Sequence, residues 1–254
     1  MIDGIKSILI WAAIILLIIC WLPLLAIRRL FDFDPARYKT GRLFRKLGKA
    51  VSKVNPNWQI VISGNTDIDD RHPYVMVCNH LSQADIPLIS NLPWEMKWVA
   101  KEELFKVPFS GWMMRLAGDI SVDRKSLMRK RTTLSKGSDY LNKNCSVIFF
   151  PEGTRSRTGK LHKFTMGAFE LAIRNGVPVL PLVIDGTQDC LPKKSWKFGV
   201  AQDIRLKVLD PVKTEHLSSN DIEDLTKAVR SKILQQLSDW RDEPASEIDY
   251  MAKD

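Results

Sequence analysis

Hydrophobic positions form one long run near the N-terminus and short runs after Pro56. The long run, Ile8 to Ile27, contains 20 residues without a charge. As a helix it extends about 30 Å, at roughly 1.5 Å per residue, which is enough to cross the hydrocarbon core of a bilayer. Because the run continues into Ala-Ile-Arg-Arg without a small-x-small cleavage site, it predicts an uncleaved membrane helix over residues 1–28. Pro23 leaves a helix lying in one leaflet as an alternative to a spanning one.

The next segment, residues 29–55, combines positive charge with helical periodicity. From Arg28 to Lys53, nine Lys or Arg stand against two Asp, so this stretch holds most of the formal net charge of +9. Apolar residues recur among these charges at helical spacing, namely Leu43, Phe44, Leu47, Val51 and Val54. The pattern predicts an amphipathic helix on anionic lipid, with packing on the domain core as the alternative. A nucleic-acid partner is disfavoured because the charge adjoins the membrane helix.

The same charge predicts an orientation. Lys and Arg beside a membrane helix stay on the cytoplasmic side. We therefore expect the main domain to face the cytoplasm, at the inner membrane of a bacterium. Both the spanning and the one-leaflet helix place that domain at the bilayer surface.

Residues 56–241 alternate between strand and helix patterns. The predicted strands are Gln59 to Ser63, Tyr74 to Cys78, Ile120 to Val122, Ser146 to Phe150, Val179 to Ile184 and Ile204 to Leu209. The predicted helices are Asp85 to Ser90, Glu102 to Leu116, Leu127 to Leu141, Met166 to Arg174, and a last one after Asn220 with Glu223 completing its cap. Such alternation predicts one α/β domain with a mixed, mostly parallel sheet flanked by helices. The acidic residues 242–254 have few apolar positions, and we expect a mobile tail there.

Composition narrows the class of protein. With 45% hydrophobic and 26% charged residues, the chain is neither disordered nor a polytopic transporter. Its four cysteines are far apart and form no CxxC pair, which argues against a zinc cluster or a disulfide framework. A reducing compartment fits this usage.

The first candidate for chemistry follows the predicted strand that ends at Cys78. In open α/β sheets, ligands bind at the carboxyl ends of the strands, and His80 stands just beyond this one. An imidazole can accept a proton at neutral pH, and Asp85 is placed to orient it. The alternative is that Ser82 and Asp85 form a helix capping box and His80 is an incidental loop residue. Cys78 is a weaker candidate, as a thiol nucleophile.

The second candidate follows the predicted strand Ser146 to Phe150. The strand runs into Pro-Glu-Gly-Thr-Arg-Ser, where Arg155 offers a planar fork for a phosphate or carboxylate. Gly153 allows close backbone approach to a ligand, and Thr154 adds a hydroxyl. A surface turn with a solvated arginine is the alternative, disfavoured by the apolar strand that feeds directly into it.

Together these residues resemble the PlsC-type glycerolipid acyltransferases. The N-H-x-x-x-x-D motif matches at Asn79, His80 and Asp85, and F-P-E-G-T-R-S matches from Phe150 to Ser156. Two further blocks occur in order, G-x-x-F-I-D-R at residues 118–124 and V-P-x-x-P at residues 177–181. In the former, Ser121 and Val122 replace the usual Phe and Ile, which puts the identity of the acceptor in question. The resemblance covers residues 56–212.

The resemblance implies an activity and roles for residues. His80 would be the general base and Asp85 would hold its tautomer, while an acyl group passes from acyl-CoA or acyl carrier protein to a lysophospholipid. The acceptor implied is 1-acylglycerol 3-phosphate and the product is phosphatidic acid, with no cofactor and no metal. Arg155, Arg124 and Lys101 would bind the acceptor phosphate, and Glu152, Gly153 and Thr154 would shape its site.

Several alternatives stay open at this point. Lys101 is equally a surface charge or a donor to the thioester oxygen. The apolar residues Phe105, Phe109, Trp112 and Met113 would line an acyl-chain tunnel or simply pack in the core. The acceptor is alternatively glycerol 3-phosphate, another lysophospholipid or a lipid without phosphate. A noncatalytic protein that binds anionic lipid is the remaining alternative.

Overall fold

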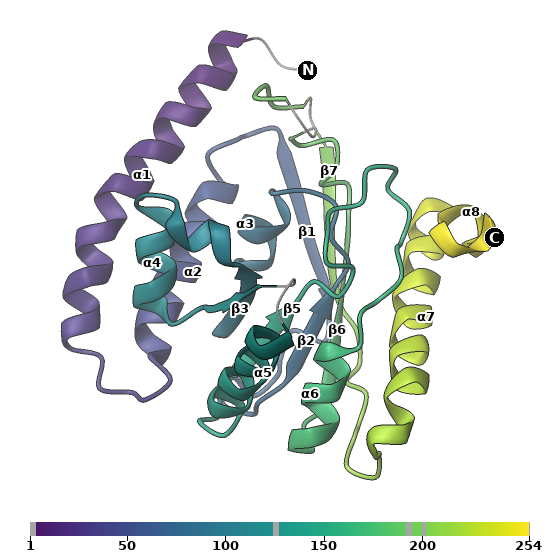
Figure 1. Ribbon diagram of the computed structural model, residues 1–254. Helices are drawn as coiled ribbons and strands as arrows, with labels where there is room; N and C mark the ends of the chain where they lie inside the picture. Colours follow the sequence, from purple (N-terminus) through teal and green to yellow (C-terminus); the bar gives the residue numbers. More distant parts are fainter. Residues whose placement is uncertain (1–3, 124–126, 192–194, 200–201, 254) are drawn as a thin grey trace.

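A seven-stranded sheet forms the centre of the described part of the chain (Figure 1). The computed structural model describes residues 4–123, 127–191, 195–199 and 202–253. Its strands are β1 (Trp58–Gly64), β2 (Val75–Cys78), β3 (Met96–Lys101), β4 (Ile120–Val122), β5 (Ser146–Phe149), β6 (Val179–Asp185) and β7 (Gln202–Val208). They are ordered β1-β7-β6-β2-β5-β3-β4, and every neighbouring pair is parallel except β6 with β7. The predicted mixed, mostly parallel sheet is confirmed.

Helices cover both faces of the sheet (Figure 1). One face carries α2 (Tyr38–Ser52), α3 (Asp85–Ile89) and α4 (Ser110–Ala117), and the other carries α5 (Leu127–Leu141), α6 (Gly167–Asn175) and α7 (Ile222–Arg241). In β2, Met76 and Cys78 pack into the core under α3, while Val75 and Val77 pack into the core under α6 and α7. All four are fully buried, which explains why this strand is an uninterrupted apolar run.

Strand β3 was not predicted, because two lysines interrupt its apolar pattern. Lys97 is nevertheless fully buried. Its ammonium lies 3.0 Å from Glu95 Oε1 and donates to the carbonyl oxygens of Ala117 and Arg37. These partners come from distant segments, so a local pattern does not reveal a lysine that belongs to the core.

The single helix predicted for Glu102 to Leu116 is wrong. A 3₁₀ turn, η1 (Glu102–Lys106), precedes α4, and an extended Val107 separates the two. Pro108 disfavours helical backbone at the residue before it, and Phe109 has a φ of 61°. The chain therefore turns here rather than continuing one helix.

The C-terminal segment differs from prediction in two ways. The capping box before α7 joins Ser218 to Asp221, within η2 (Ser219–Asp221), rather than Asn220 to Glu223. The tail, expected to be mobile, carries α8 (Ala245–Ile248) and η3 (Tyr250–Lys253), and packs on the domain. Ile248 is buried in the core, and Asp249 lies 2.6 Å from the guanidinium of Arg230 on α7. Backbone hydrogen bonds to Leu161 add to these contacts, so an otherwise polar segment is held on the domain.

The N-terminal helix α1 (Gly4–Leu30) lies alongside the domain (Figure 1). By length and composition it qualifies as a candidate membrane span. Ser7 Oγ accepts a hydrogen bond from the amide of Phe198, and Leu25 is fully buried against Leu47 of α2 and Met113 of α4. One side of α1 therefore contacts the domain from its first turns to its last.

Helix α2 packs between α1 and α3, so its apolar stripe faces protein. Leu47 and Arg45 are both buried, whereas Lys46 and Lys49 are exposed. Of the two interpretations of the basic segment, packing on the domain is the one observed for its apolar face.

Candidate active site

The predicted site residues follow the carboxyl ends of four adjacent strands. His80 follows β2, Glu152 to Arg155 follow β5, and Lys101 ends β3. Arg124 follows β4 but lies outside the described residues. Since these four strands are parallel neighbours, their carboxyl ends meet at one edge of the sheet. The topology thus gathers motifs that are up to 75 residues apart in the sequence.

His80 and Asp85 form a hydrogen-bonded dyad. Nδ1 of His80 lies 2.6 Å from Oδ2 of Asp85. The Asp85 side chain is fully buried, whereas the His80 side chain is 18% exposed. A carboxylate accepts from Nδ1–H, which leaves the lone pair of the imidazole on Nε2. Among the described residues no protein group bonds to Nε2, so that nitrogen is available to accept a proton.

The capping interpretation and the catalytic one prove compatible. Oδ2 of Asp85 also accepts hydrogen bonds from the amides of Leu81 and Ser82, at 2.8 and 3.0 Å. Ser82 Oγ accepts from the amide of Ala84. The same carboxylate therefore orders the loop before α3 and orients the imidazole.

Two residues to which the sequence assigned no role, Thr187 and the motif residue Asn79, complete this arrangement. Thr187 Oγ1 donates to Asp85 Oδ1 at 2.5 Å, and both side chains are fully buried. The Asn79 side chain donates to the carbonyl of Ile184 and accepts from its amide, each at 2.8 Å, which ties the end of β2 to β6. Thr187 follows the carboxyl end of β6, a parallel neighbour of β2. Its place just after a predicted strand is the feature of the sequence that could have pointed to it.

Glu152 acts on the loop rather than facing solvent. Its Oε1 accepts from the amide of His80 at 2.7 Å, and its Oε2 accepts from the amide of His162 at 3.0 Å. Burial raises the pKa of Glu152 to about 7. The carbonyl of His80 in turn accepts from the amide of Ser156. Both carboxyl oxygens are engaged by backbone, so Glu152 shapes the site by joining two loops.

A ring stack supports the imidazole on one side. Phe150 lies 4.0 Å from the His80 ring, centroid to centroid, with an angle of 16° between the planes. The Trp98 ring of β3 in turn lies 5.7 Å from the Phe150 ring, centroid to centroid. With Asp85 fixing Nδ1 and Phe150 fixing the ring plane, His80 has one defined orientation.

The groups expected to bind phosphate differ in their surroundings. Arg155 is half-buried and has no ion-pair partner among the described residues. Lys101 is 59% exposed and lies 3.1 Å from Glu103. Gly153 adopts a φ of 73°, a left-handed conformation that favours glycine, and Thr154 is exposed beside it. Arg155 is therefore the cation most available to a bound anion.

An apolar cavity of about 320 Å³ lies on the α3 side of the sheet. Side chains from α1, α2 and β3 line it, including Ile14, Ile18, Phe44, Leu47, Val51 and Trp98. Of the four residues considered for an acyl tunnel, Met113 lines this cavity and Phe105 is buried beside another. Phe109 and Trp112 are 39% and 47% exposed and contact each other.

A second cavity, of about 380 Å³, lies on the α5 side of the sheet. We call it the junction cavity. Its lining includes Val99, Val122, Thr133, Leu134, Phe150 and Gly153. Through Phe150 and Gly153 it adjoins the loop that holds His80. The dyad thus has a cavity on each side of the sheet.

Cys78 is unsuited to attack a substrate. It is fully buried, and burial raises the pKa of its thiol well above the ordinary value. The group at this edge that is placed to take a proton is the His80 imidazole.

Known proteins share both this sequence and this fold. The family model described as Acyltransferase matches residues 59–185. A chloroplastic 1-acyl-sn-glycerol-3-phosphate acyltransferase from Arabidopsis thaliana is 33% identical over 206 residues, 81% of this chain and 56% of the relative. A 1-acyl-sn-glycerol-3-phosphate acyltransferase from Saccharomyces cerevisiae is 34% identical over 83% of this chain and 69% of its own length. The chain thus spans little more than half of the plant relative.

A solved structure extends the likeness to nearly the whole chain. The crystal structure of the 1-acyl-sn-glycerophosphate acyltransferase PlsC from Thermotoga maritima superposes with a TM-score of 0.78 at 27% identity, covering 93% of this chain and 95% of that one. Fold and family match together define an acyltransferase domain. Within that class, the chain belongs to the PlsC-type glycerolipid acyltransferases.

Proposed function

We propose that this protein transfers a fatty acyl group from an acyl thioester to the free hydroxyl of 1-acylglycerol 3-phosphate, producing phosphatidic acid. The observation that carries the proposal is the 2.6 Å contact between His80 Nδ1 and the buried carboxylate of Asp85. That contact leaves Nε2 as a base at the edge of the sheet. The names of the relatives from Arabidopsis and yeast support this acceptor.

In the proposed reaction, Nε2 of His80 removes the proton of the acceptor hydroxyl as its oxygen attacks the thioester carbonyl. The carbon–oxygen bond forms and the carbon–sulfur bond breaks. The imidazolium returns the proton to the departing thiolate, which leaves as a thiol. Asp85 stabilises the imidazolium between these steps. A thioester is already activated, so a positioned base, worth roughly 10² to 10⁴ in rate, is sufficient chemistry for this transfer.

Arg155 is the proposed ligand of the acceptor phosphate. Its planar guanidinium suits a phosphate monoester, and it has no competing ion pair among the described residues. Lys101, at the end of the neighbouring strand, adds a second cation to the same edge. Arg124 keeps the role that the family resemblance implies.

The apolar cavity is the proposed site for a fatty acyl chain. Its walls are almost wholly apolar, and it lies between α3, which begins at Asp85, and the long helix α1. A chain leaving the bilayer beside α1 would enter it without crossing water.

Helix α1 is the proposed membrane contact, lying in one leaflet. Apolar side chains on its outer side are exposed to the surroundings, for example Leu9 at 64%, Leu16 at 62% and Ile27 at 55%. The opposite side packs along the domain from Ser7 to Leu25. A transmembrane orientation would carry that packed surface into hydrocarbon, whereas an in-plane helix keeps the domain in water. The predicted cytoplasmic face and bacterial inner membrane remain predictions.

The test compares acceptors with and without phosphate. Arg155→Ala should raise KM for 1-acylglycerol 3-phosphate about tenfold or more and leave transfer to monoacylglycerol unchanged. The matched control is Arg157→Ala, which removes an exposed arginine two residues away. Wild-type protein that acylates monoacylglycerol as efficiently as the phosphorylated acceptor would contradict the proposed substrate.

A further inference from the structure

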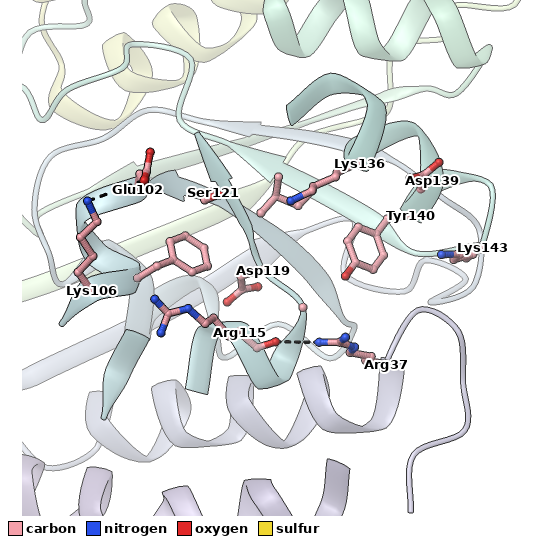
Figure 2. Close-up of a pocket in the computed structure, with 13 residues that line it drawn as sticks. Arg37, Glu102, Lys106, Arg115, Asp119, Ser121, Lys136, Asp139, Tyr140 and Lys143 are labelled. Atoms are coloured by element: carbon pink, nitrogen blue, oxygen red, sulfur yellow. Dashed lines mark hydrogen bonds and ion pairs between the residues drawn. The ribbon is translucent and has the colours of Figure 1, made fainter. Parts of the chain in front are cut away.

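A third cavity, of about 540 Å³, has no part in the chemistry described above. It lies outside the edge strand β4, between α5 and the η1–α4 segment (Figure 2). Lys136 and Tyr140 project from α5, Lys143 lies in the turn that follows it, and Lys106 and Arg115 stand on the opposite side (Figure 2). We call it the cationic cavity.

Positive charge is in excess around this cavity. Five cationic side chains line it, with three carboxylates. One carboxylate, Asp119, is bound by the guanidinium of Arg45 at 2.6 Å and is buried. Another, Glu102, lies 3.8 Å from Lys106. With Asp119 paired to Arg45 and Glu102 paired to Lys106, four cations and one carboxylate remain in the lining, an excess of three positive charges. Like charges around one cavity repel unless an anion occupies it.

The same cavity offers aromatic surface. Phe105 and Tyr140 line it, and Lys143 lies 5.8 Å from the Tyr140 ring centroid. Arg37 contributes a guanidinium whose Nη1 donates to the carbonyl of Arg115, so this cation is held in place. Phosphate-binding forks beside flat rings suit a ligand that joins several phosphates to a heteroaromatic base.

The cationic cavity adjoins the junction cavity through shared elements. On β4, Ser121 lines the former and the next residue, Val122, lines the latter. On α5, Lys136 lines the former and Thr133, one turn earlier, lines the latter. The lining of the junction cavity includes Phe150, which stacks on His80. A ligand with its phosphates in the cationic cavity and its thioester beyond the junction cavity would reach the His80–Asp85 dyad.

We propose that the cationic cavity binds the phosphorylated nucleotide end of acyl-coenzyme A, and that the pantetheine arm passes along the junction cavity toward His80. This inference rests on the proposed function and specifies its donor. A carrier protein presents its pantetheine arm through a single phosphodiester and brings no nucleotide, so a hollow with several cations and two rings would have nothing to hold. The acceptor phosphate, by contrast, is assigned to Arg155 at the carboxyl edge.

The test removes charge from two exposed positions in the full chain, one on α5 and one in the turn after it. Lys136→Ala combined with Lys143→Ala should raise KM for acyl-coenzyme A about tenfold and leave KM for 1-acylglycerol 3-phosphate unchanged. Lys232→Ala, an exposed lysine on α7, is the matched control. Wild-type protein should prefer acyl-coenzyme A to its 3′-dephospho analogue, and the double variant should lose most of that preference.

The affinity for coenzyme A itself tests the cationic cavity without catalytic turnover. In equilibrium titrations, the double variant should bind coenzyme A about tenfold more weakly than wild type. Equal affinities, or transfer from acyl carrier protein but not from acyl-coenzyme A, would overturn the donor site while leaving the transferase function standing. Loss of transfer from every donor, with coenzyme A still bound through Lys136 and Lys143, would overturn the proposed function and support the site.

Discussion

Thr187 Oγ1 donates a hydrogen bond of 2.5 Å to Asp85 Oδ1, on the oxygen of the carboxylate that His80 does not contact. The other oxygen is held by His80 and by the amides of Leu81 and Ser82. The buried carboxylate of Asp85 thus has hydrogen-bond partners on both of its oxygens. Asp85 is fixed from the loop after β6 as well as from the loop before its own helix, and we assign Thr187 as a positioning residue.

Thr187→Val should lower kcat about tenfold and leave KM for both substrates near the wild-type value. A methyl group replaces the hydroxyl while the branched shape of the side chain is kept, so Asp85 loses a donor and the imidazole loses orientation. Thr187→Ser, which restores the hydroxyl, should recover most of kcat. Steady-state kinetics of the two variants make the comparison, and a Ser variant as slow as the Val variant would argue for a packing role only.

Glu152 predicts a pH dependence of stability. Burial raises its pKa to about 7 from 4.5, so between these values the unfolded state releases the proton before the folded state does. The free energy of unfolding should therefore fall by about 3 kcal/mol as pH rises through this window. Glu152→Gln should lose that dependence in urea unfolding at pH 5 and pH 8. The same pH dependence of the free energy of unfolding in wild type and in Glu152→Gln would contradict the raised pKa of Glu152.

A buried ion-pair network joins α2 to the sheet. Arg45 Nη2 lies 2.6 Å from Asp119 Oδ1 and its Nε lies 3.5 Å from Glu95 Oε2, and all three side chains are nearly inaccessible. Arg45→Ala leaves the buried carboxylate of Asp119 without its cation, while Glu95 keeps Lys97, and it should lower the free energy of unfolding by about 3–5 kcal/mol. Lys46→Ala, at the adjacent exposed position, should change it by less than about 0.5 kcal/mol. Chemical denaturation that shows equal midpoints for both variants would contradict this account.

The outer side of α1 predicts how strongly the protein binds vesicles. Leu16 and Ile19 are 62% and 47% exposed, and each should contribute about 1.5 kcal/mol or more when it enters the bilayer. Leu16→Gln with Ile19→Gln should weaken vesicle binding about 100-fold in sedimentation assays. Val61→Gln, at an exposed apolar position on β1, is the control and should bind as wild type does. Equal binding by the double variant would contradict the in-plane contact.

Much of the fold follows from local patterns, and the exceptions have physical causes. β2 and β5 could be predicted because both faces of each strand are covered, which makes them continuous apolar runs. β3 could not, because burial of Lys97 depends on Glu95 and on carbonyls from α4 and from the start of α2. The break at Pro108 had a visible signal, in the restriction that proline places on the residue before it.

In the candidate site, too, some residues could be predicted from local sequence patterns and others could not. His80 and Asp85 could be predicted as a pair because the loop is short and one strand delivers it. Thr187 could not be singled out, since it lies 102 residues from Asp85 and meets it only through the order of strands in the sheet. The lining of the cationic cavity comes from several separate segments, so its charge is invisible as a run in the sequence.

The central claim is that His80 is the general base of an acyl transfer. The most direct measurement is transfer of labelled acyl groups from acyl-coenzyme A and acyl carrier protein to 1-acylglycerol 3-phosphate by wild type, His80→Ala and His72→Ala. His72 is an exposed histidine in the loop before β2, so its variant controls for loss of an imidazole. We predict that His80→Ala loses roughly 10² to 10⁴ in rate, retains vesicle binding, and differs in rate from His72→Ala by the same factor. Transfer by His80→Ala at a rate comparable to wild type would contradict the account.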